Sequence, residues 1–519
     1  MQNQHPAPGK QLPIEINCFD ELITKGYHYI DKTQHIIKML QTSRHLLLCR
    51  PNHFGKTLLI STLTALFKGK KELFKGLWVE NRWDWAKTNP VVNLSFKPVA
   101  TEPYNFEAAL KQQLHANANQ FGILLSQGPL EHLVHELVNQ LSQKSGRVVI
   151  LIDDYDAPLS GYPDTTVQDE VNLHVLKAFY ASLKTVSSQL RLVFSTGQSP
   201  IARKTLFPDW KHLAELTLNP KFGKILGFTI QEIQNTFGPR LTELATQYES
   251  LEELTQNLSD WYGGFSWNVH DKVHHPGALL YFLNSAQPMQ YWSCIDPPTN
   301  IVKYLNQHGV YHLDHIEANE SAFSCFDPNK SIRPFTLLFQ TGYLSIQAYR
   351  KDGTYTLGYP NKAVRQYLLS HLLAETTGDD TDQYEAKTMR LHNALAKNKP
   401  QEFARGLTAF FKPIPKRQFK NNPDGYYYTI TYLALNLLST YVHALASTAY
   451  GQPDCVVYLP NATYIIELTL GQSATEAMQL AKTNNHSKHY SIIGQPTTIL
   501  AMNFNPAKKA IDGALTEVA

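Results

Sequence analysis

The stretch "LLLCRPNHFGKTLLIST", residues 46–62, decides the fold. It begins as an apolar strand, and the leucines beyond Lys56 recur at helical spacing. The loop between them ends in Gly55, Lys56 and Thr57, the second half of the phosphate-binding pattern G-x-x-x-x-G-K-S/T. In that pattern backbone N–H groups wrap the β-phosphate, the lysine reaches the β and γ oxygens, and the hydroxyl binds Mg²⁺. Arg50 occupies the position of the first glycine, so we expect a phosphate loop that is entered with an ordinary side chain.

A second apolar strand ends in acidic residues. The run "VVILIDDYD", residues 148–156, brings Asp153 and Asp154 to the end of that strand. There Asp153 is expected to order Mg²⁺ and Asp154 to position the attacking water. Carboxylates at strand ends also cap helices or form turns, but here they share one alternating pattern with the phosphate loop. The two signals together predict a nucleotide-binding fold.

The order of apolar runs predicts an α/β architecture. Short apolar strands and helical stretches alternate from the phosphate loop to residue 196. The expected strands lie at 90–96, 147–153 and 190–196, and the expected helices lie near 105–118, 129–143 and 168–186. Such alternation is typical of a parallel sheet covered by helices.

The length of 519 residues allows two or three cores, because single domains rarely grow beyond about 250 residues. We expect five parts: a flexible tail, a nucleotide-binding α/β domain, a helical region with a β-hairpin at "KDG", a polar linker, and a second α/β domain. Their expected bounds are 1–15, 16–228, 229–375, 376–395 and 396–519. In the last part we expect a helix at 428–446, a hairpin at 454–469, a helix at 473–483 and a strand at 497–504.

Composition narrows the class of protein. The formal net charge of +3 gives no large field that would mark the whole chain as a nucleic-acid or membrane binder. Five scattered cysteines form neither a zinc spacing nor a disulfide framework, which favours a reducing cytosol. No apolar run approaches the roughly 18 residues needed to cross a bilayer. The sequence therefore predicts a cytoplasmic protein without a membrane span.

The motifs "CRPNHFGKT", "LIDDYDAPL", "FSTGQSP" and "LLFQTGYL" together resemble the bacterial AAA-ATPase-like family, whose members carry a C-terminal domain of the PD-(D/E)XK nuclease superfamily. In that family the loop begins with Arg-Pro and lacks the first glycine. The resemblance implies an ATP site with Mg²⁺ held by Thr57 and Asp153, and Thr196 placed like a polar sensor of the γ-phosphate, although a threonine that simply ends a strand is an open alternative. The implied nucleotide-binding residues are Arg50, Pro51, Asn52, His53, Phe54, Gly55, Lys56 and Thr57.

Two departures from the family pattern affect this site. Asn52 and His53 stand where the family has two basic residues, which removes charge from the phosphate cradle. Asp154 stands where the family has glutamate, and its shorter side chain places a general base less easily. We therefore expect nucleotide binding to survive better than hydrolysis.

The C-terminal resemblance covers a nuclease hairpin in which three of five family positions are lost, among them an arginine at Gln452 and a glutamate near Leu445. Such nucleases need an Asp on one strand and Glu-x-Lys on the next, where the carboxylates bind Mg²⁺ and the lysine polarises the water. Asp454 and Glu467 occupy the first two positions, and Gln479 matches the family's next helix, but Thr469 replaces the lysine. Lys482 on the following helix could take its place. The sequence predicts a nuclease-like fold that is degenerate in its catalytic site.

Three functions follow from these motifs. The first is an ATP-binding protein, an ATPase or ATP-dependent switch, whose C-terminal domain contacts nucleic acid or a protein partner. The second is a non-catalytic interaction protein in which both sites have decayed. The third is an ATP-regulated, metal-dependent nuclease. The sequence does not indicate an oligomeric state.

Overall fold

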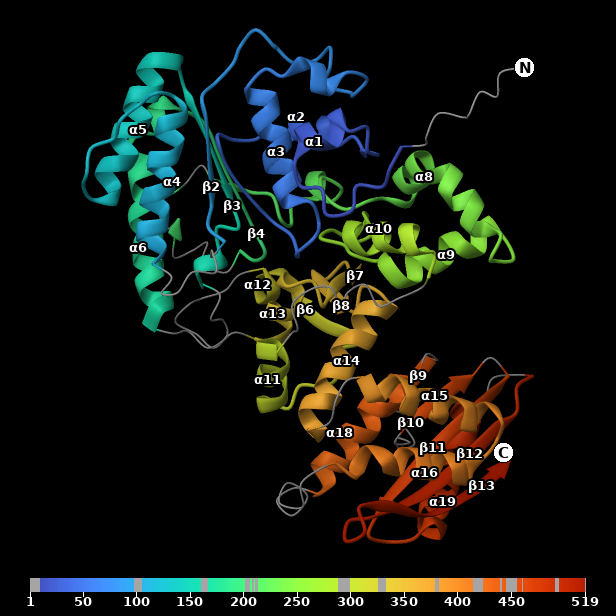
Figure 1. The fold of residues 1–519 in the computed structure, drawn as a ribbon. Coiled ribbons are helices and arrows are strands. Elements are labelled where there is room, and N and C mark those ends of the chain that lie inside the picture. The colour runs from blue at the N-terminus through green and yellow to red at the C-terminus, as the bar shows by residue number, and fades with distance from the viewer. Residues whose placement is uncertain are drawn as a thin grey trace, which may run out of the picture. The chain divides into compact units, whose positions relative to one another are not determined.

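The computed structural model of the chain forms two compact units, coloured from blue to red along the chain in Figure 1. The first unit comprises Met1–Pro297 with Leu313–Arg365, and the second comprises Pro298–His312 with Gln366–Ala519. The structure describes residues 10–97, 105–159, 167–200, 206–207, 210, 213–287, 299–324, 333–378, 382–413, 423–438, 441–444, 455–459, 461–490 and 494–518.

The first unit is built on a five-stranded parallel sheet with the order β2-β3-β4-β1-β5. Its strands are β1 (His45–Cys49), β2 (Val91–Ser95), β3 (Val148–Asp153), β4 (Leu190–Gly197) and β5 (Leu213–Glu215). The third strand, "VVILID", is buried along its whole length. A continuous apolar run of this kind belongs to a parallel strand covered on both faces. The predicted parallel α/β sheet is therefore confirmed.

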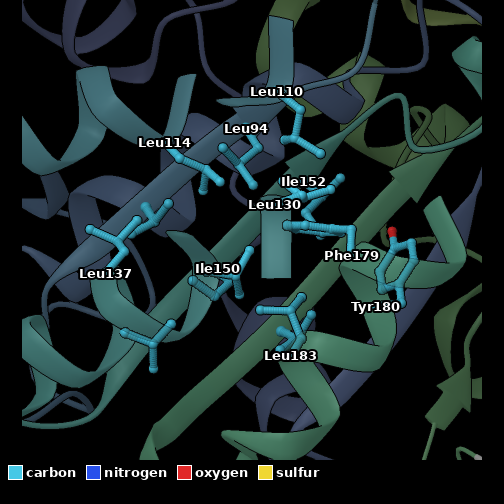
Figure 2. Close-up of a cluster of buried hydrophobic side chains, with 14 of the residues drawn as sticks. Leu94, Leu110, Leu114, Leu130, Leu137, Ile150, Ile152, Phe179, Tyr180 and Leu183 are labelled. Atoms are coloured by element: carbon cyan, nitrogen blue, oxygen red, sulfur yellow. The ribbon is translucent and has the colours of Figure 1, made fainter. Parts of the chain in front are cut away.

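Helices α4 (Phe106–Gln120), α5 (Leu130–Ser145) and α6 (Val167–Thr185) cover one face of this sheet (Figure 1). Figure 2 shows the core between them: alternate residues of the strands meet helix residues spaced by one turn or two. The labelled side chains are Leu94, Leu110, Leu114, Leu130, Leu137, Ile150, Ile152, Phe179, Tyr180 and Leu183. Helices α1 (Phe19–Thr24), α2 (Thr33–Leu40) and α3 (Lys56–Phe67) belong to the same unit, and α3 packs against β3 and β2.

The rest of the first unit is a helical cluster and a small sheet. Helices α8 (Ile230–Ala245), α9 (Leu251–Tyr262) and α10 (Pro276–Ser285) share one apolar core. The sheet has the order β6-β8-β7 and contains β6 (Ile316–Asn319), β7 (Ser345–Tyr349) and β8 (Thr354–Gly358), beside the short helices α12 (Glu320–Phe323) and α13 (Pro334–Gln340). Strands β7 and β8 are antiparallel, which confirms the hairpin predicted at "KDG".

The second unit contains a five-stranded mixed sheet with the order β13-β12-β11-β10-β9. The strands are β9 (Tyr441–Ala444), β10 (Cys455–Leu459), β11 (Ala462–Leu470), β12 (Thr497–Asn505) and β13 (Ala510–Val518). Only the pair β11 and β12 is parallel among these neighbours, and α19 (Ala474–Thr483) supplies the crossover that a parallel pair requires. The other α-helices of the described residues are α11 (Thr299–Gln307), α14 (Lys362–Thr377), α15 (Asp382–Ala396), α16 (Pro400–Phe411), α18 (Pro423–Asn436) and α20 (His486–Tyr490).

Several expected boundaries are wrong. Leu12 and Ile14 pack against the helical cluster, so the tail expected over 1–15 is ordered at its end. The linker expected over 376–395 is largely helix α15, because Leu391 and Leu395 give that polar stretch a buried face. The helix expected at 428–446 stops at Asn436, before strand β9. Strands β5 and β13 were not expected, since neither forms a continuous apolar run.

Across the part of the chain that the structure describes, no helix combines the length and the apolar composition needed to cross a bilayer.

Gly264 supplies a test of the packing within the first unit. Its backbone has a φ of +80°, and a Cβ there would overlap the carbonyl oxygen of Pro360. Gly264→Ala should therefore lower the free energy of unfolding by more than about 3 kcal/mol, because the left-handed backbone and the backbone overlap add. Gly26→Ala is the matched control, since Gly26 has a φ of +72° and open space around the added Cβ. Equal losses in urea unfolding would refute the close approach.

Candidate functional site

The predicted site residues meet at one edge of the parallel sheet. Strand β4 lies between β1 and β3, with Leu48 in register with Thr196 and Ile152 in register with Ser195. The carboxyl ends of three neighbouring strands therefore converge, and open α/β sheets bind ligands at such an edge. The phosphate loop, residues 50–55, leaves β1 at this edge, and Asp153 is the last residue of β3.

Two of the last three residues of the phosphate loop have left-handed backbone. His53 has a φ of 58° and Gly55 a φ of 94°, and helix α3 begins at Lys56. Left-handed residues in a tight loop turn successive N–H groups to one side, which makes an anion-binding concavity. The free N–H groups of the first turn of a helix add to that preference. Arg50 is absent from the residues of positive φ, so its position does not require glycine.

The side chain of Lys56, the first residue of α3, reaches back to the phosphate loop. Its side chain is buried, and its ammonium donates to the carbonyl oxygens of Arg50 and Pro51, both at 3.1 Å. Phosphate oxygens are stronger acceptors than carbonyls because they are charged. An anion that enters the loop can therefore draw the ammonium to itself at little cost.

The Asp153 carboxylate joins three elements. It accepts a hydrogen bond from the Thr57 hydroxyl at 2.6 Å and another from the Thr196 hydroxyl at 2.7 Å. Asp153 is 7% exposed and Thr196 is fully buried. The three residues that the sequence singled out on α3, β3 and β4 are thus in direct contact. Their sensor and ligand roles stay predictions.

The donor set at this point suits Mg²⁺. The described residues include no group of three or more His, Cys, Asp and Glu side chains that could cage a metal. Mg²⁺ is commonly held by one or two carboxylates together with substrate phosphates and water, rather than by an all-protein cage. A single carboxylate beside a single hydroxyl fits that requirement when a phosphate supplies further ligands.

The backbone turns at Asp154, which directly follows the last residue of β3. Its φ is 52°, an uncommon conformation for a residue other than glycine. Burial raises the pKa of its carboxyl above the usual value, while the nearby charge of Lys56 acts in the opposite direction. A raised pKa makes the ionised carboxylate a better proton acceptor.

The sequence did not single out Asp156, which binds the end of β4. Its carboxylate accepts from the backbone N–H groups of Gln198 and Ser199, and burial raises its pKa to about 6. Tyr155 also bonds this segment, through its N–H to the Thr196 carbonyl at 2.8 Å and its hydroxyl to the Ser199 carbonyl at 2.7 Å. The sequence signal that could have identified Asp156 is that it is the third acidic residue of "LIDDYD".

The Arg50 side chain holds the start of the phosphate loop from outside. Its guanidinium donates to the carbonyls of Cys49, Thr217 and Phe222 at 2.8 to 3.0 Å. It also lies over the Trp267 ring, 3.9 Å from the ring centre. Burial lowers the pKa of Arg50 to about 9. The predicted nucleotide contact of this residue is therefore left to its backbone, because its side chain is bonded elsewhere.

The apex of the phosphate loop packs against the segment 262–277, which we call the apex clamp. The buried Phe54 ring meets Phe265, Trp267 and His275 edge to face, with centroids 4.9 to 5.3 Å apart. The Asn52 carbonyl lies 3.1 Å from His275 Nε2. Sequence reasoning missed these partners because more than 200 positions separate them from the loop. The only signal was the aromatic composition of "WYGGFSWN".

A largely apolar cavity adjoins the phosphate loop. It is lined by the loop itself, by the segment before α2, by the first turn of α3, by residues 225–228 and by the start of α10. Lining residues include Ile14, Tyr29, Phe54, Leu58, Leu226 and Leu280. Lys32, also in the lining, is paired with Glu232 at 2.7 Å. A ligand with a planar apolar ring and a polyphosphate could therefore place its ring in this cavity and its phosphates at the loop.

The residues predicted for a nuclease site lie in the second unit. Glu467 and Thr469 share one face of β11, and the Glu467 carboxylate lies 3.4 Å from the buried His486 ring. The Thr469 hydroxyl donates to the Ser473 carbonyl at 3.1 Å. Gln479 is exposed on α19, and Asp454 lies outside the described residues.

The Lys482 side chain, a candidate for the role of the missing lysine, lies on α19. Its ammonium is paired with Glu517 of strand β13 at 2.5 Å, and both side chains are about half exposed. The hairpin of β10 and β11 is confirmed as a fold element, and the degenerate catalytic site stays a prediction.

The region that contains this edge of the sheet matches a known protein family. Residues 13–207 match the AAA-ATPase-like family, described as "Predicted AAA-ATPase". A protein of Azotobacter chroococcum mcd 1, described as an uncharacterized protein in the vnfD 5' region, is 28% identical over 98% of this chain and 99% of its own length. Two solved structures from Aeropyrum pernix are similar at low level. The ORC2 protein in ADPNP-ADP complexes is 11% identical, with 72% of this chain and 97% of that chain covered and a TM-score of 0.29. The ORC1 protein in complex with DNA is 10% identical, with 65% of this chain and 91% of that chain covered and a TM-score of 0.23.

The AAA-ATPase-like region includes the phosphate loop, Asp153 and Thr196 but ends before the partners that hold the loop from outside. Thr217 and Phe222, which receive Arg50, lie beyond residue 207, as does the whole apex clamp. The site is thus completed by segments that the family match does not cover.

Arg50→Lys tests the outer hold on the loop. Lysine cannot reach three carbonyls with a planar fork, so buried acceptors are left unpaired and the free energy of unfolding should fall by about 3 kcal/mol. Arg44→Lys, at an exposed position before β1, is the matched control and should change stability little. A similar loss in both variants in urea unfolding would show that the carbonyl contacts do not stabilise the fold.

Buried histidines should make the first unit sensitive to acid. Burial lowers the pKa of His274 to about 4 and that of His275 to about 3. Both rings are neutral in the fold but gain a proton when unfolded below their usual value of 6.5. Stability is therefore full above that pH and is lost as the pH falls from there toward the folded values.

The measurement is the difference in unfolding free energy between wild type and His275→Gln, because the raised pKa of Asp156 acts in the opposite sense between about pH 4 and 6 in both proteins. From pH 7 to pH 5 the variant should gain about 2 kcal/mol relative to wild type. His270→Gln removes an exposed imidazole from the same segment. An equal change in this control would contradict burial as the cause.

Proposed function

We propose that the chain is an ATP-binding protein, an ATPase or ATP-dependent switch that uses Mg²⁺. The observation that carries this proposal is the contact of Thr57 and Thr196 with the single carboxylate of Asp153, next to a lysine held inside a phosphate loop. A hydroxyl on the loop helix and a carboxylate on a neighbouring strand are the Mg²⁺ contacts of phosphate-loop nucleotide sites.

Each part then has a role toward Mg-ATP. The loop amides and Lys56 would bind the β- and γ-phosphates, and Thr57 with Asp153 would hold the metal. Bound Mg²⁺ would neutralise charge on the phosphates. The apolar cavity beside Gly55 would take the base. This cavity is what distinguishes a nucleotide from a bare phosphate as the ligand.

Asp154 is the residue we assign to the attacking water. Its raised pKa favours proton acceptance, but its side chain is shorter than the glutamate that the family resemblance implies at this position. We infer slow hydrolysis and a bound nucleotide of long lifetime, which suits a switch.

For the second unit we propose a nuclease-like module that binds nucleic acid or a protein without cleaving it. The Thr469 hydroxyl and the Lys482 ammonium are both engaged within the unit, which argues against either acting as the missing catalytic cation. Glu467 faces His486 in a buried setting, and this arrangement favours a structural role for the carboxylate.

Thermal unfolding with Mg-ATP tests the proposal. A ligand at 100 times its dissociation constant stabilises the native state by about 2.7 kcal/mol, so wild type should unfold at a higher temperature with Mg-ATP. Lys56→Ala should lose that shift, because the ammonium that reaches the phosphates is gone. Lys68→Ala, which removes an exposed lysine just after the same helix, is the control and should keep it.

Phosphate release is followed in the same samples. A shift with slow release in wild type supports an ATPase, and a shift without release supports a switch. Absence of a shift in wild type would reject ATP binding and leave a non-catalytic interaction protein.

A further inference from the structure

His275 bonds the phosphate loop and its own helix through opposite ring nitrogens. Its Nδ1 accepts from the backbone N–H of Ala278 at 3.0 Å, in the first turn of α10. An accepting Nδ1 carries no proton, so the proton of the neutral ring is on Nε2. That N–H therefore donates to the Asn52 carbonyl at 3.1 Å. One tautomer satisfies both contacts, and it is fixed by the helix cap.

The ring is held rigidly against the loop. His275 is 2% exposed, and Phe54 meets it edge to face at 4.9 Å. A Cβ added at Gly277 would lie 3.2 Å from the Cβ of His53, so the backbone of α10 also comes close to the loop apex. Because helix and loop touch at several points, the orientation of the imidazole is transmitted to the Asn52 peptide.

The bonded peptide is the one that precedes a left-handed residue of the loop. In a planar trans peptide the C=O and N–H groups point in opposite directions. With the Asn52 carbonyl turned to His275, the N–H of His53 is turned away from it. The left-handed φ of His53 then sets the direction of the next peptide. The hydrogen bond from His275 thus fixes the orientation of the Asn52–His53 peptide, at which the anion-binding concavity of the loop begins.

We propose that His275 is a positioning residue for polyphosphate binding: by donating to the Asn52 carbonyl it orients the loop amides toward the phosphates of the bound nucleotide. The inference rests on the proposed ATP binding and adds to it a residue from the helical cluster, outside the family match. It also assigns α10 a second task besides lining the cavity.

Two substitutions separate the contacts of the ring. His275→Asn places an acceptor where Nδ1 lies and keeps the helix cap, but it cannot reach Asn52. His275→Gln places a donor where Nε2 lies and gives up the cap. Capping by a side chain is worth about 1 kcal/mol, so His275→Gln should unfold at a lower temperature than His275→Asn at neutral pH without ligand.

Affinities for Mg-ATP, Mg-ADP and adenosine are measured by calorimetric titration on the full chain. For His275→Asn we expect about tenfold weaker binding of ATP and ADP with unchanged binding of adenosine, because one oriented hydrogen bond is lost and the base cavity is intact. His275→Gln should return ATP binding to within about threefold of wild type. His274→Asn removes the neighbouring buried ring, which bonds Phe228 and not the loop, and should leave the ratio of ATP to adenosine affinity unchanged.

The outcomes discriminate the levels of the argument. Wild-type ATP binding by His275→Asn, or an equal loss in His275→Asn and His275→Gln, would overturn the positioning role while ATP binding stands. A parallel loss of ATP and adenosine would do the same, because it would indicate general damage to the fold. A wild-type protein that binds no ATP would instead overturn the proposed function together with this inference.

Discussion

The contact on which the site depends is the acceptance of two hydroxyl protons by the Asp153 carboxylate. A buried carboxylate is costly unless its oxygens are hydrogen-bonded, and here each oxygen has one hydroxyl donor. The donors come from the first turn of α3 and from β4. This single side chain thus fixes the phosphate loop helix against two strands. Strand β4 must lie between β1 and β3 for the contact to form, so the strand order and the site are one constraint.

A second set of contacts holds the same loop from its outer side. Arg50 donates to carbonyls at Thr217 and Phe222, and the apex clamp receives Phe54 and the Asn52 carbonyl. Among the described residues the guanidinium has no carboxylate partner, and its charge there is stabilised by carbonyl dipoles and the Trp267 ring. A loop held at both ends and at its apex does not depend on a glycine at its start, which explains why an arginine is tolerated there.

Much of the site could be read from the sequence, because its residues lie at the ends of apolar strands or at a helix start. Lys56, Asp153 and Thr196 are such cases, and the parallel sheet followed from the alternation of runs. The outer partners could not be read, since packing across more than 200 positions leaves no local pattern. Some element boundaries were predicted wrongly for a different reason. Helix α15 is mostly polar with few buried residues, so its sequence resembles a linker, and β5 has only three residues, too few for a periodic pattern.

The charges around the loop determine what an anion needs in order to bind there. The Arg50 guanidinium is bonded to carbonyls, and Asn52 and His53 are neither lysine nor arginine. Among the described residues, Lys56 is therefore the lysine whose ammonium contacts the loop. Asp154 and Asp156 feel its field, and burial raises the pKa of both carboxyls. Asp153 adds a third carboxylate at the same edge of the sheet. Polyphosphate binding at such a site has to bring its own divalent cation and has to draw its remaining free energy from backbone amides, which makes their orientation the decisive quantity.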